Sequence, residues 1–244
     1  MSRKIITLFL VLFMLVSFSL SSTAVDIGGE LEVNTNLNFK DSITSVPPLT
    51  ELLTLKLYIP ESNNTKAVVE YNISHSKNQI NASFKKLYLE KEFEKFNLTL
   101  GKQPVSWGFG SLINPVDFNF GAEVMTQSTS AKYIEGAKVY IPINWKSGLE
   151  VVAKPNYELI NVNNYNLEET KFGLRARTMF KDYDLSLNMI HEPNNEVLKR
   201  NRIALSVKGD LGPLGAYSAL SYEKYKELDK NEEMYLFGLD YSRA

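Results

Sequence analysis

The chain has 244 residues, a formal net charge of −1 and no cysteine. This length suits one large all-β domain or two small ones, and the near-zero charge provides no basic field for nucleic acid. The lack of cysteine excludes disulfides, thiolate metal sites and cysteine nucleophiles, and two histidines, His75 and His191, leave little for metal or acid–base chemistry. We therefore expect no metal, no cofactor and no enzyme activity.

The first 24 residues have the parts of an export signal. Arg3 and Lys4 give a positive start, an apolar run extends over 5–20, and the small residues Ser22 and Ala24 fit a cleavage site. An uncleaved membrane anchor is the alternative, but a spanning helix needs ~20 apolar residues. We therefore expect residues 1–24 to be a cleaved signal peptide and residues 25–244 to form the mature domain.

Apolar and polar residues alternate from residue 27 onward. In 27–39, Leu31 and Val33 share one parity, while Glu30 and Glu32 share the other. Such a period of two predicts a strand, and ~10 residues is the length of a transmembrane strand rather than the ~5–6 of a soluble sandwich. The pattern recurs at 53–59, 66–74, 86–90, 96–101, 137–141, 149–153, 171–180, 183–189, 202–208, 214–222 and 234–241.

The predicted connections alternate between short and longer. The short ones are 61–65, 92–95, 144–147, 181–182 and 209–213, and the mostly longer ones are 40–50, 75–81, 103–132, 155–170, 191–200 and 224–233. Membrane barrels place short turns on one rim and long loops on the other, and closure satisfies every backbone polar group. We therefore predict an all-β, antiparallel up-and-down transmembrane β-barrel of about twelve strands.

The polar parity carries most of the charge. Acidic residues come from the early strands and basic residues mostly from the later ones: Glu30, Glu32, Glu70 and Glu90, then Lys138, Lys154, Arg175, Arg177, Arg202 and Lys208. We hypothesise that an acidic arc faces a basic arc across the lumen and orients charged solutes. The alternative is ordinary charge on a solvated face.

The connection 103–132 is longer than a passive turn requires, and its aromatic residues need burial. Gly108 lets the backbone bend away from a strand, Pro115 fixes a turn, and Asp117 is placed to bond backbone N–H groups there. We predict that this third long loop folds toward the lumen as a constriction loop, or as a plug that only stabilises the lumen. Its candidate pore residues are Trp107, Gly108, Asn114, Pro115, Asp117 and Glu123.

The segment VSWGFGSLINPVDF, residues 105–118, resembles the W-G…N-P-x-D segment of porin-like outer-membrane barrel families. It also follows a G-[KR]-Q strand end, here Gly101-Lys102-Gln103. The resemblance implies a bacterial outer-membrane barrel surrounded by lipid, inserted by the barrel assembly machinery and open to oligomerisation. Such barrels usually end on an aromatic residue, whereas this sequence ends Tyr241-Ser242-Arg243-Ala244, so we expect either further strands or a different sorting signal.

These features favour a porin-like channel for passive diffusion of small polar solutes. A closed barrel with a structural or adhesin role and a soluble exported β-sandwich binding protein are the alternatives. A barrel-embedded hydrolase is disfavoured, because His75 and His191 fall in predicted loops and no Gly-x-Ser-x-Gly motif is present.

Overall fold

A computed structural model describes residues 26–35, 49–76, 79–108, 114–119, 133–155, 167–193, 199–212, 214–226 and 228–241. The predicted signal peptide and the predicted pore residue Glu123 lie outside these residues.

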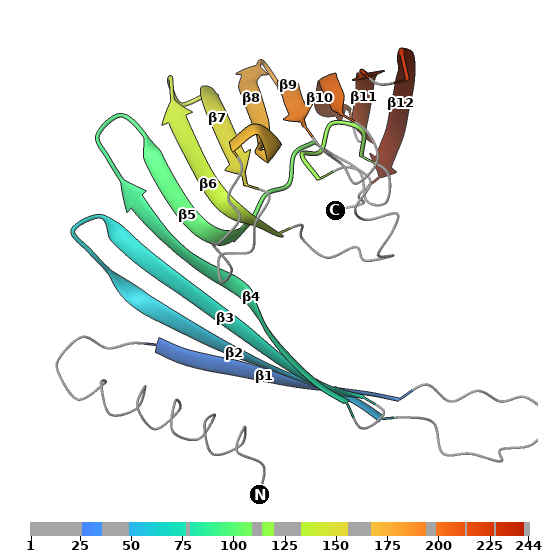
Figure 1. The fold of residues 1–244 in the computed structure, drawn as a ribbon. Helices are drawn as coiled ribbons and strands as arrows, with labels where there is room; N and C mark the ends of the chain where they lie inside the picture. The colour runs from blue at the N-terminus through green and yellow to red at the C-terminus, as the bar shows by residue number, and fades with distance from the viewer. Residues whose placement is uncertain are drawn as a thin grey trace, which may run out of the picture. The chain divides into compact units, whose positions relative to one another are not determined.

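The described chain is almost entirely β-strand (Figure 1). The strands are β1 (Asp26–Thr35), β2 (Leu49–Ser62), β3 (Thr65–Ser76), β4 (Gln79–Glu92), β5 (Asn97–Pro104), β6 (Tyr133–Pro142), β7 (Ser147–Lys154), β8 (Lys171–Phe180), β9 (Tyr183–Glu192), β10 (Arg200–Leu211), β11 (Leu214–Tyr225) and β12 (Lys230–Tyr241), with a short 3-10 helix, η2 (Leu167–Glu169), before β8. Neighbours in the sheet follow chain order from β1 to β12, which confirms an up-and-down arrangement of about twelve strands. No described helix is long and apolar enough to cross a membrane.

The chain divides into two compact units, residues 1–87 and 88–244. In the first, β1 pairs antiparallel with β2 and β2 with β3. Glu70 of β3 forms ion pairs with Lys85 and Lys86 of β4, whose Nζ atoms lie 2.9 and 2.8 Å from its carboxylate oxygens. In the second unit, β5 to β12 form a curved sheet (Figure 1).

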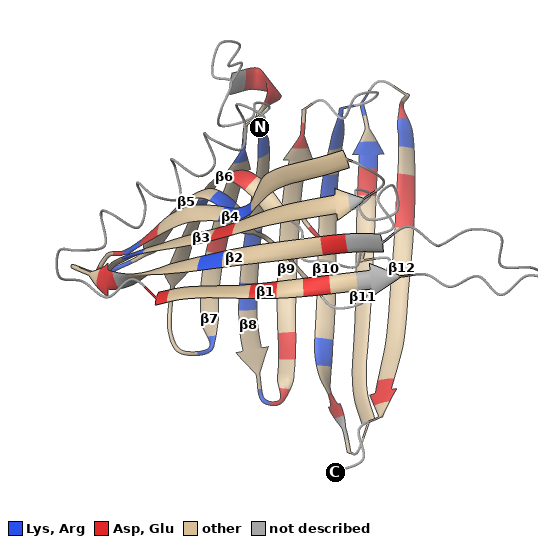
Figure 2. Cartoon of the chain, turned by 90° about the horizontal axis from the view of Figure 1, so that it is seen from below, with Lys and Arg blue, Asp and Glu red and all other residues tan. Residues whose placement is uncertain are grey.

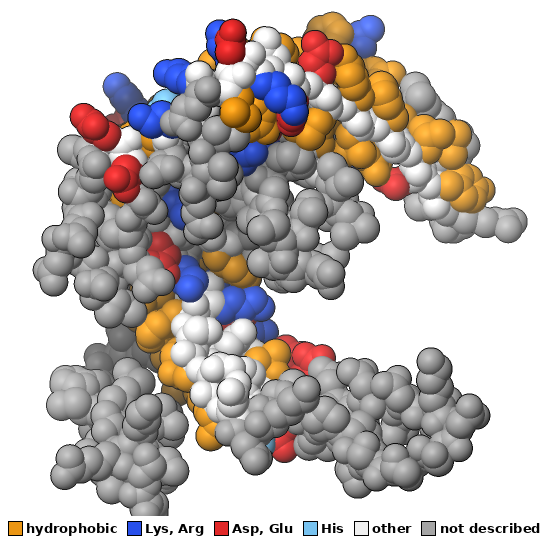
Figure 3. Space-filling view, turned by 45° about the vertical axis from the view of Figure 1, so that its right-hand side comes forward, with side chains coloured by type: hydrophobic (Ala, Val, Ile, Leu, Met, Phe, Trp, Pro, Cys, Tyr) orange, Lys and Arg blue, Asp and Glu red, His pale blue; other side chains and the backbone are white. Residues whose placement is uncertain are grey.

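Side chains in the second unit alternate between the two faces as predicted. In β10, Arg202, Ala204 and Ser206 are buried, whereas Ile203 and Leu205 are about half exposed. We call the face with the buried residues inward, and it is the concave one; the outward face carries rows of aliphatic and aromatic side chains (Figure 3). The period-two alternation in the sequence therefore places apolar residues on one face of the sheet and polar residues on the other.

The predicted short turns are confirmed and two of the longer connections are shorter than predicted. β3 ends at Ser76 and β4 begins at Gln79, so the connection predicted at 75–81 is wrong. Likewise β11 reaches Tyr225 and β12 begins at Lys230, within the connection predicted at 224–233. The alternation did not predict these extensions, because the strand ends are polar and backbone pairing continues beyond the last apolar residue.

Two kinds of local structure fix the register of the hairpins. Asn63 and Asn64, between β2 and β3, both have positive φ, at 50° and 57°, as a two-residue type I′ hairpin requires. Tyrosine rings also cover glycines on neighbouring strands, at Tyr140 over Gly148, Tyr183 over Gly209 and Tyr217 over Gly238. A Cβ at these glycines would lie 2.0–2.5 Å from an atom of the tyrosine side chain, so only glycine fits beneath each tyrosine.

Candidate functional site

The candidate site is built on residues 105–108 and 114–119, which we call the inner segment. β5 ends at Pro104, so the chain leaves the sheet near the predicted start of this connection at residue 103 and before Gly108. The segment lies against the concave face of the second unit (Figure 1). Its buried residues are Val105, Trp107, Asn114, Pro115, Val116, Asp117, Phe118 and Asn119, and Gly108 beside them is half-buried. The prediction that this loop folds inward is confirmed.

Two polar side chains hold the two parts of the inner segment together. Asn114 Nδ2 donates to the carbonyl of Trp107 at 2.6 Å. Asp117 accepts from the backbone N–H of Trp107 at 3.2 Å, from Ser106 Oγ at 3.3 Å and from the backbone N–H of Asn119 at 2.8 Å. We call this arrangement the clip. The Asp117 N–H also bonds the Asn114 carbonyl at 3.1 Å, which closes the turn predicted around Pro115.

Gly108 is required by the close approach within the clip. Its φ is +80°, a conformation that side-chain-bearing residues rarely adopt. A Cβ there would lie 1.9 Å from Val116 and 2.8 Å from the Asn114 side-chain oxygen.

The sheet beneath the clip supplies a matching apolar strip, which we call the seat. Trp107 and Phe118 pack edge to face, with ring centroids 5.3 Å apart, among Ile134 of β6, Val152 of β7 and Ile190 of β9. Gly173 of β8 completes the strip, since a Cβ there would lie 2.6 Å from both aromatic rings.

The seat continues farther along the sheet, where Val116 packs on Ala204 of β10 and Ala219 of β11, with Leu236 of β12 beside them. Inward positions of β6 to β12 are therefore small or apolar where the segment crosses them, in a face that is otherwise polar.

Hydrogen bonds from the wall fix the segment on its seat. Asn188 Nδ2 of β9 donates to the carbonyl of Val116 at 2.9 Å. Arg202 of β10 donates to the carbonyl of Asp117 at 2.7 Å, and Trp107 Nε1 donates to Glu150 of β7. Buried polar groups cost free energy unless they are bonded, so these contacts specify one position for the segment.

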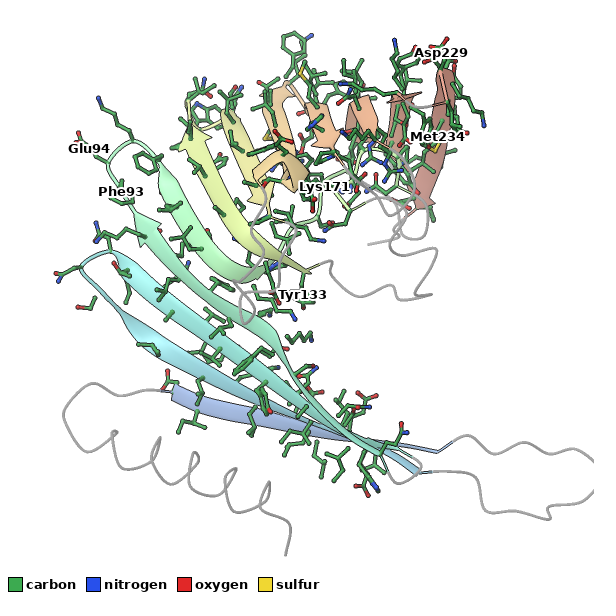
Figure 4. All side chains as sticks on the ribbon, in the orientation of Figure 1. Phe93, Glu94, Tyr133, Lys171, Asp229 and Met234 are labelled. Carbon is green, nitrogen blue, oxygen red and sulfur yellow. The ribbon has the colours of Figure 1, made fainter. Side chains whose placement is uncertain are left out.

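A chain of ion pairs, the rim network, runs along the inward side of the long-loop ends of β8 to β12. Lys171 contacts Glu192 at 2.8 Å, Arg200 bridges Glu192 and Glu223, and Arg202 contacts Glu223 at 3.2 Å. Tyr225 donates to Glu223 at 2.9 Å and to Glu232 at 3.2 Å. Figure 2 shows charges of both signs on these strands, and Figure 4 places Lys171 on the concave side.

The rim network also touches the inner segment. Lys171 Nζ lies 4.7 Å from the centroid of the Phe118 ring, and Arg202 joins Glu223 to the Asp117 carbonyl. Positive charge over an aromatic face is stabilising, more so where water is excluded. The clip, the seat and the rim network therefore form one continuous structure.

The predicted charged residues lie on the polar parity in both units. Glu30 lies 3.7 Å from Lys56, and Glu32 is exposed on the same strand; Glu70 pairs with Lys85 and Lys86. These contacts belong to the first unit. An acidic arc that faces a basic arc stays a prediction.

In the second unit, the predicted basic residues have acidic neighbours of their own. Arg177 binds Asp184, with Nε at 2.9 Å from Oδ1, and Arg202 binds Glu223. Arg175, close to Glu150 and Asp117, and Lys138 are partly buried, while Lys208 is exposed.

Sequence reasoning missed Glu150 and most of the rim network. Glu192, Arg200, Glu223 and Tyr225 stand at strand ends that the prediction assigned to loops or left out. Extending the alternation by one to three residues places all of them inward. The seat had a signal too, because Ile134, Val152, Gly173, Ile190 and Ala204 interrupt the polar parity of consecutive strands.

No protein-family model and no curated protein sequence matches the chain. Solved structures do resemble it. OccK2 (OpdF) of Pseudomonas aeruginosa in complex with glucuronate has a TM-score of 0.54 at 10% identity, over 89% of this chain and 60% of OccK2. OpdK of the same organism with vanillate has a TM-score of 0.52 at 11% identity, over 88% of this chain and 62% of OpdK; a further OpdK structure, described as an outer membrane protein, has a TM-score of 0.50.

The chain therefore spans about three-fifths of the length of these solved structures. At 10–11% identity the likeness concerns the fold, which is the antiparallel up-and-down sheet of porin-type β-barrels. That agrees with the fold class predicted from the alternation of residues.

Proposed function

We propose that the protein is a porin-like barrel of the bacterial outer membrane, through which small polar solutes diffuse passively. The observation that carries this proposal is an outward apolar band with a polar boundary at the long-loop end. On β9 the outward residues are Tyr183, Leu185, Leu187 and Met189, and then His191, which bonds Asn201 of β10 at 2.6 Å.

The same boundary recurs on other strands. Outward residues of β5 change from Leu100 to Lys102, which pairs with outward Glu135 of β6 at 3.4 Å. On β11 they change from Tyr222 to Lys224. On β9 and β12, four consecutive outward apolar residues span about 20 Å along the strand, of the same order as the ~25 Å apolar band of transmembrane barrels.

The inward face supports a water-filled interior. Arg177 and Lys208 on this face remain exposed. Charged side chains on a lumen face tune which solutes pass, whereas the same charges facing lipid are costly. The inner segment is bonded to the wall along its length, so we propose that it is a fixed constriction, with Trp107, Gly108, Asn114, Pro115 and Asp117 as the residues that hold its shape.

The first solutes to test are small organic anions, because OccK2 was solved with glucuronate and OpdK with vanillate. Export by cleavage after Ala24, insertion by the barrel assembly machinery and assembly into oligomers belong to the same proposal. Sequencing the N-terminus of the membrane-extracted protein checks the first of these, and Val25 is the expected first residue.

The decisive experiment reconstitutes the full chain in liposomes and planar bilayers. We expect a heat-modifiable band on gels, discrete conductance steps, and swelling of liposomes in glucuronate and in neutral sugars. A heat-modifiable protein that gives neither conductance nor swelling would indicate a closed structural or adhesin barrel instead. A soluble protein without a heat-modifiable form would contradict the membrane barrel altogether.

A further inference from the structure

The short turn between β6 and β7 carries an unusually exposed aromatic side chain. Trp145 is 85% exposed, and neighbouring Ile143 is 60% exposed. Lys146 Nζ lies 4.4 Å from the centroid of the Trp145 ring. An indole that its own chain leaves uncovered, beside a cation, is typical of the boundary between lipid and water.

A second turn of the same kind lies next to it. The backbone N–H of Met179, at the end of β8, bonds the carbonyl of Lys146 at 3.0 Å, which brings the β6–β7 and β8–β9 turns together. The second turn presents Phe180, 63% exposed, with Lys181 Nζ 5.8 Å from the centroid of its ring. Two lysines and two aromatic rings are thus gathered at this rim. Exposed Asp182 is the acidic residue of the turn, and Asp184 beyond it is bound by Arg177.

The outward face next to these turns is hollowed. A groove of about 550 Å³ begins at Ile143 and Ser147 and crosses β7 to β11. Small outward residues make the hollow: Ser147 and Thr178, whose hydroxyls bond at 2.8 Å, and Ala176. Leu149, Leu185 and Leu205 line its sides. This volume lies within the ~300–1,000 Å³ of small-molecule sites.

We propose that this groove and the two turns bind one anionic phospholipid. An acyl chain lies in the groove, the phosphate lies between Lys146 and Lys181, and the rings of Trp145 and Phe180 lie at the level of the headgroup. Charge and shape both favour this occupant, because the apolar groove ends where the two lysines are. The β10–β11 turn, which includes Gly212, has neither lysine nor aromatic residue. The β4–β5 turn has Phe93 and Lys95, but neither lines the groove, so the groove is what distinguishes this site. The inference rests on the proposed membrane-embedded barrel.

The test titrates the full chain, folded in lipid-free detergent micelles, with brominated phosphatidylglycerol or brominated phosphatidylcholine. Bromine quenches nearby tryptophan, and the chain has two tryptophans. Subtracting the signal of Trp145→Phe from that of the unmodified protein isolates the Trp145 contribution. We expect phosphatidylglycerol to quench Trp145 at a roughly thirtyfold lower concentration, because each of two lysines near a surface favours an anionic lipid by about 1 kcal/mol, which is roughly fivefold.

Substitution separates the parts of the site. Lys146→Gln with Lys181→Gln removes the preference for phosphatidylglycerol, and Ala176→Phe, which fills the groove, weakens binding of both lipids. Lys226→Gln, an exposed lysine at the opposite rim, leaves both titrations unchanged. If the protein is heat-modifiable, equal quenching by the two lipids, or an unchanged preference in the double variant, overturns the lipid site but not the barrel. A chain with no heat-modifiable form defeats the barrel and this site together.

Discussion

The polar faces of the two units follow one alternation but are used differently. In β1 to β3 the polar positions, such as Glu30, Lys56 and Asn72, lie on a face where Thr54 and Glu70 are the buried residues among those described. In β8 to β11 many positions of the corresponding face are buried, and the inner segment packs against this part of the sheet.

The difference shows what a seat for a folded-in loop requires. Where the segment crosses, inward residues become small or apolar, as at Gly173, Ile190 and Ala204. Where it is bonded to the wall, fully buried polar groups appear, as at Asn188 and Arg202. An ion pair in the covered region is therefore isolated from water, whereas one in the first unit keeps access to it.

The largest expected effect concerns the ion pairs, which are buried in the second unit and reach water in the first. Glu223→Gln leaves Arg202, whose side chain is 1% exposed, without its buried counter-ion and costs about 3–5 kcal/mol in the free energy of unfolding. Urea titration of the reconstituted protein, followed by tryptophan fluorescence, measures it. Glu70→Gln is the matched control and costs about 1 kcal/mol, because Lys85 and Lys86 are about one-third exposed and reach water. Equal losses in the two variants would contradict the distinction.

Opening the clip should have the next largest effect. Asp117→Ala removes the acceptor of two backbone N–H groups and of Ser106, which costs about 2–3 kcal/mol of docking free energy. We expect a larger single-channel conductance as the segment leaves its seat. Ser106→Ala removes one contact of a partly exposed hydroxyl and serves as the control, with conductance unchanged. Equal conductance in all three proteins would show that the segment does not line the path.

A smaller loss tests the seat itself. Val116→Ala removes two buried methyl groups from the contact with Ala204 and Ala219 and costs about 2 kcal/mol. Val33→Ala in the first unit, at a position 54% exposed, costs less than about 0.5 kcal/mol. Urea midpoints of the two variants decide this, and a loss at Val33 as large as that at Val116 would refute the seat.

The smallest expected effect concerns exposed ion pairs, for which we expect the same small loss in both units. Lys230→Gln breaks an exposed pair with Glu232, and Lys56→Gln breaks one with Glu30. Each changes the free energy of unfolding by at most about 0.5 kcal/mol, because solvent screens exposed pairs. Repeating the titrations in high salt should bring these values closer to zero, because salt screens exposed charges. A larger loss in either unit would mean that its lysine is less solvated than its exposure indicates.

Strand number, pairing order and the inward course of the long loop could be predicted from the sequence. Period-two alternation records burial directly, and the Asn114-Pro115 turn follows from backbone sterics. Asp117 was predicted to bond backbone N–H groups, and it does so twice.

The seat and the rim network could not be predicted as easily. A face that is polar except for a few residues looks like imperfect alternation until the covering segment is known, as at Ile190 and Val152. Charged strand ends such as Glu192 and Arg200 look like loops, because propensity favours apolar strands and their ion pairs arise from residues distant in sequence.

The clip also orders events in time. The bonds that join the two parts of the inner segment link residues 7 to 11 positions apart, as in Asn114 to Trp107 and Ser106 to Asp117. Its bonds to the wall join residues 72 and 85 positions apart, at Asn188 and Arg202. Short loops close before long ones because less chain entropy is lost. The clip therefore forms while β9 and β10 are still unpaired, and the inner segment docks after these strands have formed. Docking of the inner segment therefore follows closure of the clip, because its hydrogen bonds to the wall exist only once β9 and β10 have formed.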